Sequence, residues 1–193
     1  MNICIFGASS SRLDPAFYQD AEQAGRLIAL AGHCIVFGGG SDGLMGACAR
    51  GAKAEGGRII GIAPKIFNEP GILLPDCDEL ILTDSMSTRK EQMFSMSDSF
   101  LALPGGIGTM DEFFEAITLR QLGLLHGPLV LLNTLGFYSP LVAFLENMAE
   151  RGFMSRNCLA LLRVCDTPDQ AIEALLLPDH LDGSIRRLED YTR

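Results

Sequence analysis

The sequence predicts an α/β fold in which a parallel sheet of about seven strands carries helices on both faces. Two observations predict it: short apolar runs rich in β-branched residues recur along the chain, and helical periodicity follows most of them. The predicted strands are 3–6, 34–37, 58–62, 79–82, 100–103, 129–132 and 161–165. The predicted helices are 15–31, 43–55, 87–97, 109–122, 140–151 and 168–176. Because ligands of such sheets bind beyond the carboxyl ends of the strands, the loops after strands are the first candidates for a site.

Length and composition predict one globular domain that covers residues 1–193. The chain has 193 residues, of which 48% are apolar and 20% charged, close to the average for folded domains. No internal repeat, low-complexity tract or linker divides it. The polar end, residues 178–193, is expected either to form a flexible tail or to dock on a partner subunit, and the sequence leaves both possibilities open.

Hydropathy, cysteine usage and charge exclude several classes of function. The longest apolar stretches are far shorter than the roughly 20 residues of a membrane span, and the first residues carry no export signal. Six cysteines occur without a CxxC pair, a pattern typical of reduced thiols in the cytoplasm. A net charge of −9 opposes binding to a nucleic acid polymer. We therefore expect a soluble cytoplasmic protein that binds no membrane and whose phosphate ligand, if any, is a small molecule.

The first of two glycine loops, residues 37–46 (FGGGSDGLMG), lies between a predicted strand and a predicted helix. Backbone N–H groups at such a junction can hold a phosphate. The loop matches the dinucleotide fingerprint G-x-G-x-x-G, but the acidic residue expected about 20 positions later is missing, and Leu44 replaces the lysine of a Walker loop. Ligand contact through residues such as Gly39 and Gly40 and a tight structural turn both remain open.

The second glycine loop, residues 103–112 (LPGGIGTMDE), is more informative. Thr109 and Glu112 have the T-x-x-E spacing of a capping box, which has a purely structural role at the start of a helix. That role does not account for the three glycines of the loop, which leave the helix start bare of side chains so that an anion can approach its N–H groups. These glycines are Gly105, Gly106 and Gly108. The loop therefore predicts a phosphate pocket.

A cationic segment follows the fourth predicted strand. Helical spacing places Met86, Arg89 and Met93 on one face, so Arg89 lies on a partly apolar stripe. A solvated surface run is the alternative, and it suits Lys90 and Glu91 better than Arg89, because long cations avoid apolar stripes unless they are paired. The planar guanidinium of Arg89 suits a phosphate or a carboxylate.

Three segments carry a resemblance to a known family: Gly38-Gly-Gly-x-x-Gly-Leu-Met-Gly46, Met86-x-x-Arg-Lys90 and Pro104-Gly-Gly-x-Gly-Thr-x-x-Glu112. Together they resemble the LONELY GUY family of cytokinin riboside 5′-monophosphate phosphoribohydrolases, and the last motif is highly specific. The likeness continues through 113–123 and 128–153, and so covers most of the chain up to about residue 155. It implies a Rossmann-like doubly wound fold, a homodimer or a larger assembly of dimers, and no metal or organic cofactor.

The resemblance also implies an activity and roles for individual residues. The activity is hydrolysis of the N-glycosidic bond of a nucleoside 5′-monophosphate, either AMP or a cytokinin riboside 5′-monophosphate, to the free base and ribose 5-phosphate. Arg89 and Glu112 correspond to the catalytic pair. Glu112 would stabilise oxocarbenium-like charge on the ribose and orient water, and Arg89 would clamp the nucleotide or stabilise the departing base. The expected substrate-binding residues are Gly39, Gly40, Lys90, Gly105, Gly106, Ile107, Gly108 and Thr109.

Two positions differ from the usual family pattern, and three other functions compete with the proposed one. Ser87 stands where histidine is common, and Arg12 stands where a glycine is common. A related Rossmann-like binding protein, such as a carrier of molybdenum cofactor, would use a glycine loop without catalysis. A nicotinamide-dependent oxidoreductase rests on the first glycine loop alone. Lysine decarboxylation, a label that family members often carry, needs a lysine aldimine with pyridoxal phosphate, yet no lysine lies in a recognisable cofactor motif.

Overall fold

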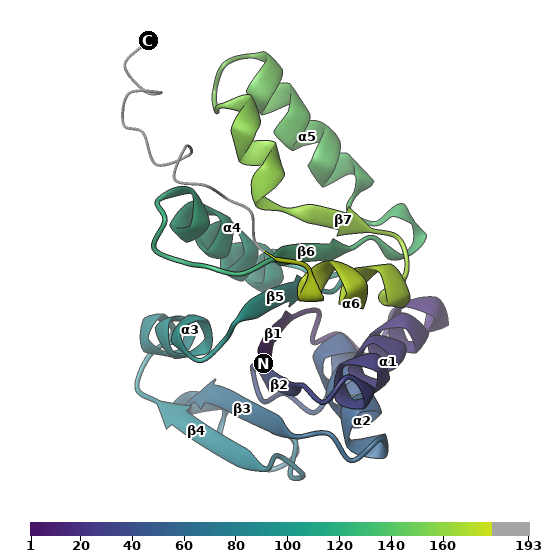
Figure 1. Ribbon diagram of the computed structural model, residues 1–193. Helices are drawn as coiled ribbons and strands as arrows, with labels where there is room; N and C mark the ends of the chain where they lie inside the picture. The colour runs from purple at the N-terminus through teal and green to yellow at the C-terminus, as the bar shows by residue number, and fades with distance from the viewer. Residues whose placement is uncertain (179–193) are drawn as a thin grey trace.

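A computed structural model describes residues 1–178, which build one sheet of seven parallel strands (Figure 1). The strands are β1 Asn2–Phe6, β2 Cys34–Phe37, β3 Ile59–Pro64, β4 Glu79–Thr83, β5 Ser99–Ala102, β6 Leu129–Leu132 and β7 Arg163–Cys165. Their order across the sheet is β4-β3-β2-β1-β5-β6-β7, and every neighbouring pair is parallel. The predicted α/β class and the predicted number of strands are confirmed.

Helices cover both faces of the sheet, as predicted. They are α1 Pro15–Leu30, α2 Gly43–Ala54, α3 Met86–Ser95, α4 Ile107–Gln121, α5 Ser139–Glu150 and α6 Pro168–Leu176. Helices α1, α2 and α6 pack on one face, where Ile3 and Ile5 of β1 point. Helices α3 and α4 pack on the other, where Cys4 and Phe6 point. Because successive strand residues face opposite sides, two apolar cores form on a sheet that is buried on both faces.

The strand order reverses at the centre of the sheet. From β1 the chain proceeds outward through β2, β3 and β4, and it then returns to the other side of β1 and proceeds through β5, β6 and β7. The loops after β1 and β5 therefore leave the same sheet edge side by side, and the amide of Ala8 donates to the carbonyl oxygen of Pro104 at 3.0 Å. In doubly wound sheets this switch point is where ligands bind.

The structure corrects several predicted boundaries. Leu161, predicted to open the last strand, instead ends the 3-10 helix η3 Arg156–Leu161, whose start is capped by the Ser155 side chain. Two further 3-10 turns, η1 Lys65–Phe67 and η2 Thr134–Gly136, were not predicted, because three residues are too few to show periodicity. The proposed tail lies outside the described residues apart from Pro178. Within the described residues, no helix is both long and apolar enough to cross a bilayer.

Candidate active site

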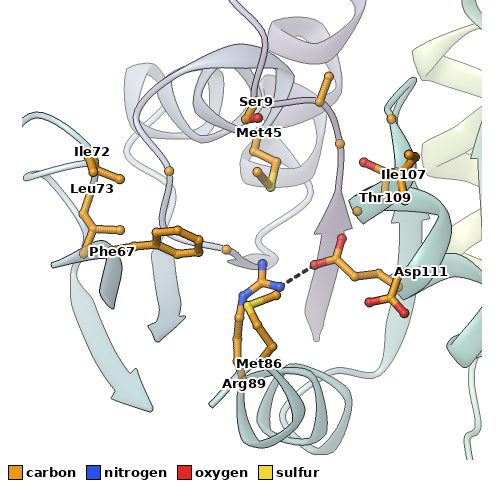
Figure 2. A pocket seen from close by; sticks show the side chains of 17 residues that line it. Ser9, Met45, Phe67, Ile72, Leu73, Met86, Arg89, Ile107, Thr109 and Asp111 are labelled. Carbon is orange, nitrogen blue, oxygen red and sulfur yellow. Dashed lines mark hydrogen bonds and ion pairs between the residues drawn. The ribbon is translucent and has the colours of Figure 1, made fainter. Parts of the chain in front are cut away.

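A cavity of about 540 Å³ opens at the switch point of the sheet (Figure 2). Five parts of the chain line it: the loop after β1, the first glycine loop with the start of α2, the segment between β3 and β4, helix α3, and the start of α4. The lining residues with side chains able to make polar contacts are Ser9, Arg89, Thr109, Asp111 and Glu112. The cavity therefore gathers both halves of the predicted catalytic pair with most of the second glycine loop.

Arg89 and Glu112 form a buried ion pair inside this cavity. Arg89 Nη1 lies 2.6 Å from Glu112 Oε1, and only 8% of each side chain is exposed to solvent. The guanidinium also donates from Nε to the carbonyl oxygen of Ile62 in β3, at 3.2 Å. A cation and an anion taken out of water require such pairing, and the contact between α3 and α4 fixes both groups at one point.

Helix α3 delivers Arg89 from the edge of the sheet. Ser85 caps the helix, and its hydroxyl oxygen accepts from the amide of Thr88 at 3.1 Å. One turn further, Arg89 and Met93 are buried, whereas Met86 is partly exposed and lines the cavity. The predicted apolar stripe is confirmed, and the alternative of a solvated arginine is wrong because Arg89 is 6% exposed.

Burial raises the pKa of the Glu112 carboxyl above its usual value near 4.5, and the nearby Arg89 guanidinium opposes this effect. Burial is the larger influence, so the carboxylate holds a proton more readily than an exposed glutamate does. A carboxylate with a raised pKa is a better proton acceptor near neutral pH. The surroundings of Glu112 thus favour a role in proton transfer.

The capping-box alternative for Glu112 is wrong. Helix α4 begins at Ile107, two residues earlier than predicted, and its N-cap is Gly106, which has no side chain to cap the first turn. Thr109 is therefore the third residue of the helix, and the Glu112 carboxylate reaches Arg89 instead of the helix start.

The amino end of α4 is left bare toward the cavity. Among the described residues, none accepts a hydrogen bond from the amides of Ile107, Gly108 and Thr109. A Cβ added at Gly106 or Gly108 would meet no atom within 4 Å, so neither position is filled by the protein itself. Unpaired N–H groups at a helix start, without side chains around them, form a site for an anion.

The glycines predicted to bind substrate differ in their position relative to the cavity. Gly40, Gly106 and Gly108 line the cavity, whereas Gly39 and Gly105 do not. A Cβ at Gly105 would lie 2.1 Å from Thr109 Oγ1, so this glycine permits the close packing of its own loop.

The first glycine loop is occupied largely by contacts within the protein. A Cβ at Gly38 would lie 2.3 Å from Arg89 Nη2, so the glycine makes room for the guanidinium. Gly39 has a positive φ of 73°, and its carbonyl oxygen accepts from the amide of Leu74 at 2.8 Å. The amide of Ser41 donates to the carbonyl oxygen of Ile72 at 2.9 Å. These contacts favour the interpretation of the loop as a structural turn, with Gly40 at the cavity surface.

Lys90 does not line the cavity. Its ammonium group contacts Asp111 at 2.9 Å and Glu115 at 2.5 Å on α4. Burial by itself would lower the pKa of Lys90, but hydrogen bonds to Glu115 and Asp111 raise it overall, so the group stays charged. Lys90 therefore joins α3 to α4 beside the Arg89–Glu112 pair.

Sequence reasoning missed the apolar wall of the cavity. This wall comes mainly from the segment after β3 and consists of Met45, Phe67, Ile72, Leu73 and Met86. The loop after β1 also contributes Gly7, Ala8 and Ser9. Both segments directly follow a predicted strand, and this position could have marked them as candidates. The segment after β3 carries no motif, however, and its return toward the first glycine loop depends on backbone contacts that a sequence pattern does not reveal.

The lysines of the chain do not fit a pyridoxal phosphate aldimine at this site. The sequence has three lysines, Lys53, Lys65 and Lys90. Each forms an ion pair, with Asp78, with Asp84, and with Asp111 and Glu115 respectively, and none lines the cavity. Within the described residues, no group of three or more His, Cys, Asp and Glu side chains is placed to hold a metal ion.

Comparison with known proteins relates this site to two groups of relatives. Residues 45–175 match the family described as "possible lysine decarboxylase". The chain is 35% identical over 191 residues to a probable cytokinin riboside 5′-monophosphate phosphoribohydrolase of Oryza sativa subsp. japonica, covering 99% of the chain and 80% of the relative. It is 36% identical over 178 residues to a cytokinin riboside 5′-monophosphate phosphoribohydrolase of Rhodococcoides fascians, covering 92% of the chain and 90% of the relative.

Among solved structures, the molybdenum cofactor binding protein of Rippkaea orientalis superposes with a TM-score of 0.68 at 26% identity, over 89% of this chain and 93% of that one. Its likeness confirms the Rossmann-like fold. The sequence identity is higher for the phosphoribohydrolases, at 35% and 36%, than for this molybdenum cofactor binding protein. The chain belongs to the family described as "possible lysine decarboxylase", whose relatives above are named phosphoribohydrolases, and this is the LONELY GUY family that its motifs resemble.

Proposed function

We propose that the protein hydrolyses the N-glycosidic bond of a nucleoside 5′-monophosphate, AMP or an N6-modified relative, and releases the free base and ribose 5-phosphate. The observation that carries the proposal is the buried Arg89–Glu112 pair in the same cavity as the bare amino end of α4. The names of the relatives, cytokinin riboside 5′-monophosphate phosphoribohydrolases, support the same chemistry.

The 5′-phosphate binds at the start of α4 in this proposal. The free amides of Ile107, Gly108 and Thr109 and the positive end of the helix dipole attract its negative charge. The Thr109 hydroxyl is a further donor at the cavity wall. Gly39, Gly105 and Lys90 act indirectly: the glycines shape the two loops, and Lys90 holds Asp111 beside the mouth of the cavity.

Glu112 acts on the ribose. As the bond between the anomeric carbon and the base nitrogen breaks, its electron pair leaves with the base and positive charge develops on the sugar. The Glu112 carboxylate stabilises this charge and accepts a proton from the water that attacks the anomeric carbon. This proton then passes to the nitrogen of the departing base, so that the base is released neutral and Glu112 is ionised again. Arg89 keeps the carboxylate in place at 2.6 Å and presents a positive charge to the electron-rich departing base.

The protein also acts in the cytoplasm as a homodimer or a larger assembly of dimers in this proposal. Helix α4 exposes Ile107 and Phe114, and Leu122 is exposed directly after the helix. A second cavity of about 500 Å³ on this helix is lined by Ile107, Met110, Phe114 and Leu119 among others. An apolar surface of this kind is typical of an interface. All six cysteines are free thiols, which suits a reducing compartment. Sedimentation equilibrium of the full chain measures the oligomeric state.

The activity is tested by incubation with AMP and with adenosine, followed by chromatography for free adenine. We expect AMP to react at least about a hundredfold faster, because phosphate binding supplies energy for the reaction at the distant sugar. Equal turnover of both compounds would refute the role of the phosphate. Glu112→Gln and Arg89→Ala should remain folded by circular dichroism and lose hydrolysis, and near wild-type turnover of either variant would refute the assigned roles.

A molybdenum cofactor binding protein is the competing function, and the structural neighbour from Rippkaea orientalis favours it. A carrier has no need for a carboxylate with a raised pKa that is paired with an arginine inside the cavity. Release of adenine from AMP, lost in Glu112→Gln, therefore decides for the hydrolase. Absence of release from any nucleoside monophosphate decides against it.

A further inference from the structure

The segment that follows β3 forms one wall of the cavity, and we call residues 65–74 the strap. It begins with the 3-10 turn Lys65–Phe67 and returns to the first glycine loop, where Leu73 forms an isolated antiparallel bridge with Gly40. The amide of Leu74 donates to Gly39 O at 2.8 Å, and the Ser41 amide donates to Ile72 O at 2.9 Å. Both ends of the strap are therefore anchored, one to the sheet and one to the loop.

Phe67 is the aromatic side chain of the strap, and it lines the cavity. Figure 2 shows its ring on one side of Arg89, whereas Ile107 and Thr109 at the start of α4 lie on the opposite side. Phe67 is 41% exposed, although a phenylalanine of a core is usually buried. Its neighbour Ile66 is 72% exposed and does not line the cavity.

We propose that the base of the nucleotide stacks on Phe67 and that the strap is the element that selects the base. This inference rests on the proposed function. With the phosphate at the start of α4 and the sugar beside Glu112, the base extends across Arg89 to the wall on which Phe67 lies. Stacking on an aromatic ring favours a flat purine over the smaller ring of a pyrimidine, because contact area increases with ring size.

The remaining cavity residues of the strap also point to selection by shape. Ile72 and Leu73 line the cavity beside Phe67, and neither has a side chain that donates or accepts a hydrogen bond. A wall of this composition reads no polar edge of the base, and it accepts an apolar substituent on the base without leaving a polar group unpaired. The strap therefore favours a flat purine through stacking and makes no side-chain hydrogen bond to the edge of the base.

The test measures binding of AMP and of ribose 5-phosphate, which lacks the base, by titration calorimetry in a Glu112→Gln background so that AMP is not consumed. Phe67→Ala should weaken AMP binding about tenfold, as loss of one stacking contact does. Ribose 5-phosphate binding should stay within about twofold of the parent, because that ligand does not reach the ring. Phe67→Tyr should restore AMP binding, and the control Ile66→Ala should leave both ligands unaffected.

Two results would overturn the inference: unchanged AMP binding in Phe67→Ala, or equal weakening of AMP and ribose 5-phosphate, which would mean that the ring only supports the loop. The proposed function fails separately, if the wild-type protein releases no base from any nucleoside monophosphate. In that case a base-dependent loss of AMP binding in Phe67→Ala would still support the stacking role.

Discussion

The two glycine loops follow β2 and β5, the strands on either side of β1, and lead into α2 and α4. The surroundings of their glycines differ. In the first loop a Cβ at Gly38 would collide with Arg89, and a Cβ at Gly43 would lie 2.1 Å from the carbonyl oxygen of Ala8. In the second loop a Cβ at Gly106 or Gly108 would meet open space. Gly38 and Gly43 are therefore required by the packing of the fold, whereas Gly106 and Gly108 leave open space at the start of α4 that a ligand can enter.

This difference shows that the role of a glycine motif, structural or ligand-binding, depends on the space around its glycines. The first loop has the better formal match to a nucleotide fingerprint, but its backbone groups are used by the strap and its glycines by Arg89 and by the loop after β1. The second loop lacks that fingerprint and offers free amides at a helix start. Substitution of single glycines in each loop should therefore separate stability from binding.

The largest effect is expected for Gly43→Ala in the first loop. Gly43 has a φ of 66°, and the added Cβ would collide with backbone atoms of Ala8 and Ser9. We expect a loss of about 3 kcal/mol in the free energy of unfolding, measured by urea denaturation. Gly56→Ala is the matched control, because Gly56 has a similar φ of 71° and open space around it. Equal losses in both variants would show that φ strain alone accounts for the effect.

Gly106→Ala should have the opposite consequence in the second loop. Its φ of −89° suits alanine and its Cβ would meet no protein atom, so the free energy of unfolding should change by less than about 0.5 kcal/mol. The KM for AMP should rise about tenfold, because the methyl group occupies the approach to the helix amides. Steady-state kinetics and urea denaturation of the same sample test both halves. A destabilised variant with unchanged KM would reverse the comparison.

A smaller effect is expected where the protein supports the base of the second loop. The Tyr138 hydroxyl, which is buried, donates to the carbonyl oxygen of Leu103 at 2.7 Å, directly before the loop begins. Burial raises the pKa of this hydroxyl, so it remains a donor. Tyr138→Phe should cost about 1 kcal/mol in the free energy of unfolding. Tyr18→Phe removes a solvent-exposed bond of 2.8 Å to Ser10 O and a long, part-buried bond of 3.4 Å from the Leu13 amide, and should cost less. An equal cost would contradict a special role for Tyr138.

The smallest effect concerns the pH dependence of the stability that Glu112 contributes. Glu112 belongs to the second loop and pairs with Arg89, for which Gly38 of the first loop makes room. Because burial raises the pKa of Glu112 in the folded protein above its usual value near 4.5, protonation favours the folded state. This contribution is present below pH 4.5 and is lost as the pH rises through the raised value. The Tm of the wild type relative to Glu112→Gln should therefore fall as the pH rises above 4.5. A relative Tm that rises over this range would mean that Arg89 outweighs burial.

Much of the fold and part of the site followed from the sequence, for identifiable reasons. Strands buried on both faces, such as β1, show as continuous apolar runs, and α4 shows a regular apolar face, so both were predicted close to their observed bounds. Arg89 and Glu112 lie 23 positions apart, and their pairing was suggested by the family resemblance instead of by periodicity.

The position of the strap and the ion pairing of Lys90 outside the cavity could not be predicted from the sequence, for physical reasons. The strap is held by main-chain hydrogen bonds between Leu74 and Gly39 and between Ser41 and Ile72, and such bonds do not depend on side-chain identity, so they leave no pattern in the sequence. Lys90 follows Arg89 directly, but successive helical residues point about 100° apart, so one faces the cavity and the other faces α4.

Attachment through main-chain atoms gives the strap a freedom that the rest of the site lacks. Substitution of Phe67, Ile72 or Leu73 leaves the amide and carbonyl groups that hold the strap unchanged. It also leaves the contact between Arg89 and Glu112 unchanged, because that contact joins α3 to α4 and does not involve the strap. On the proposed role of the strap, a few point mutations at these positions should change the preferred nucleobase while the Arg89–Glu112 pair stays intact. Directed evolution for new leaving groups should begin at these three positions.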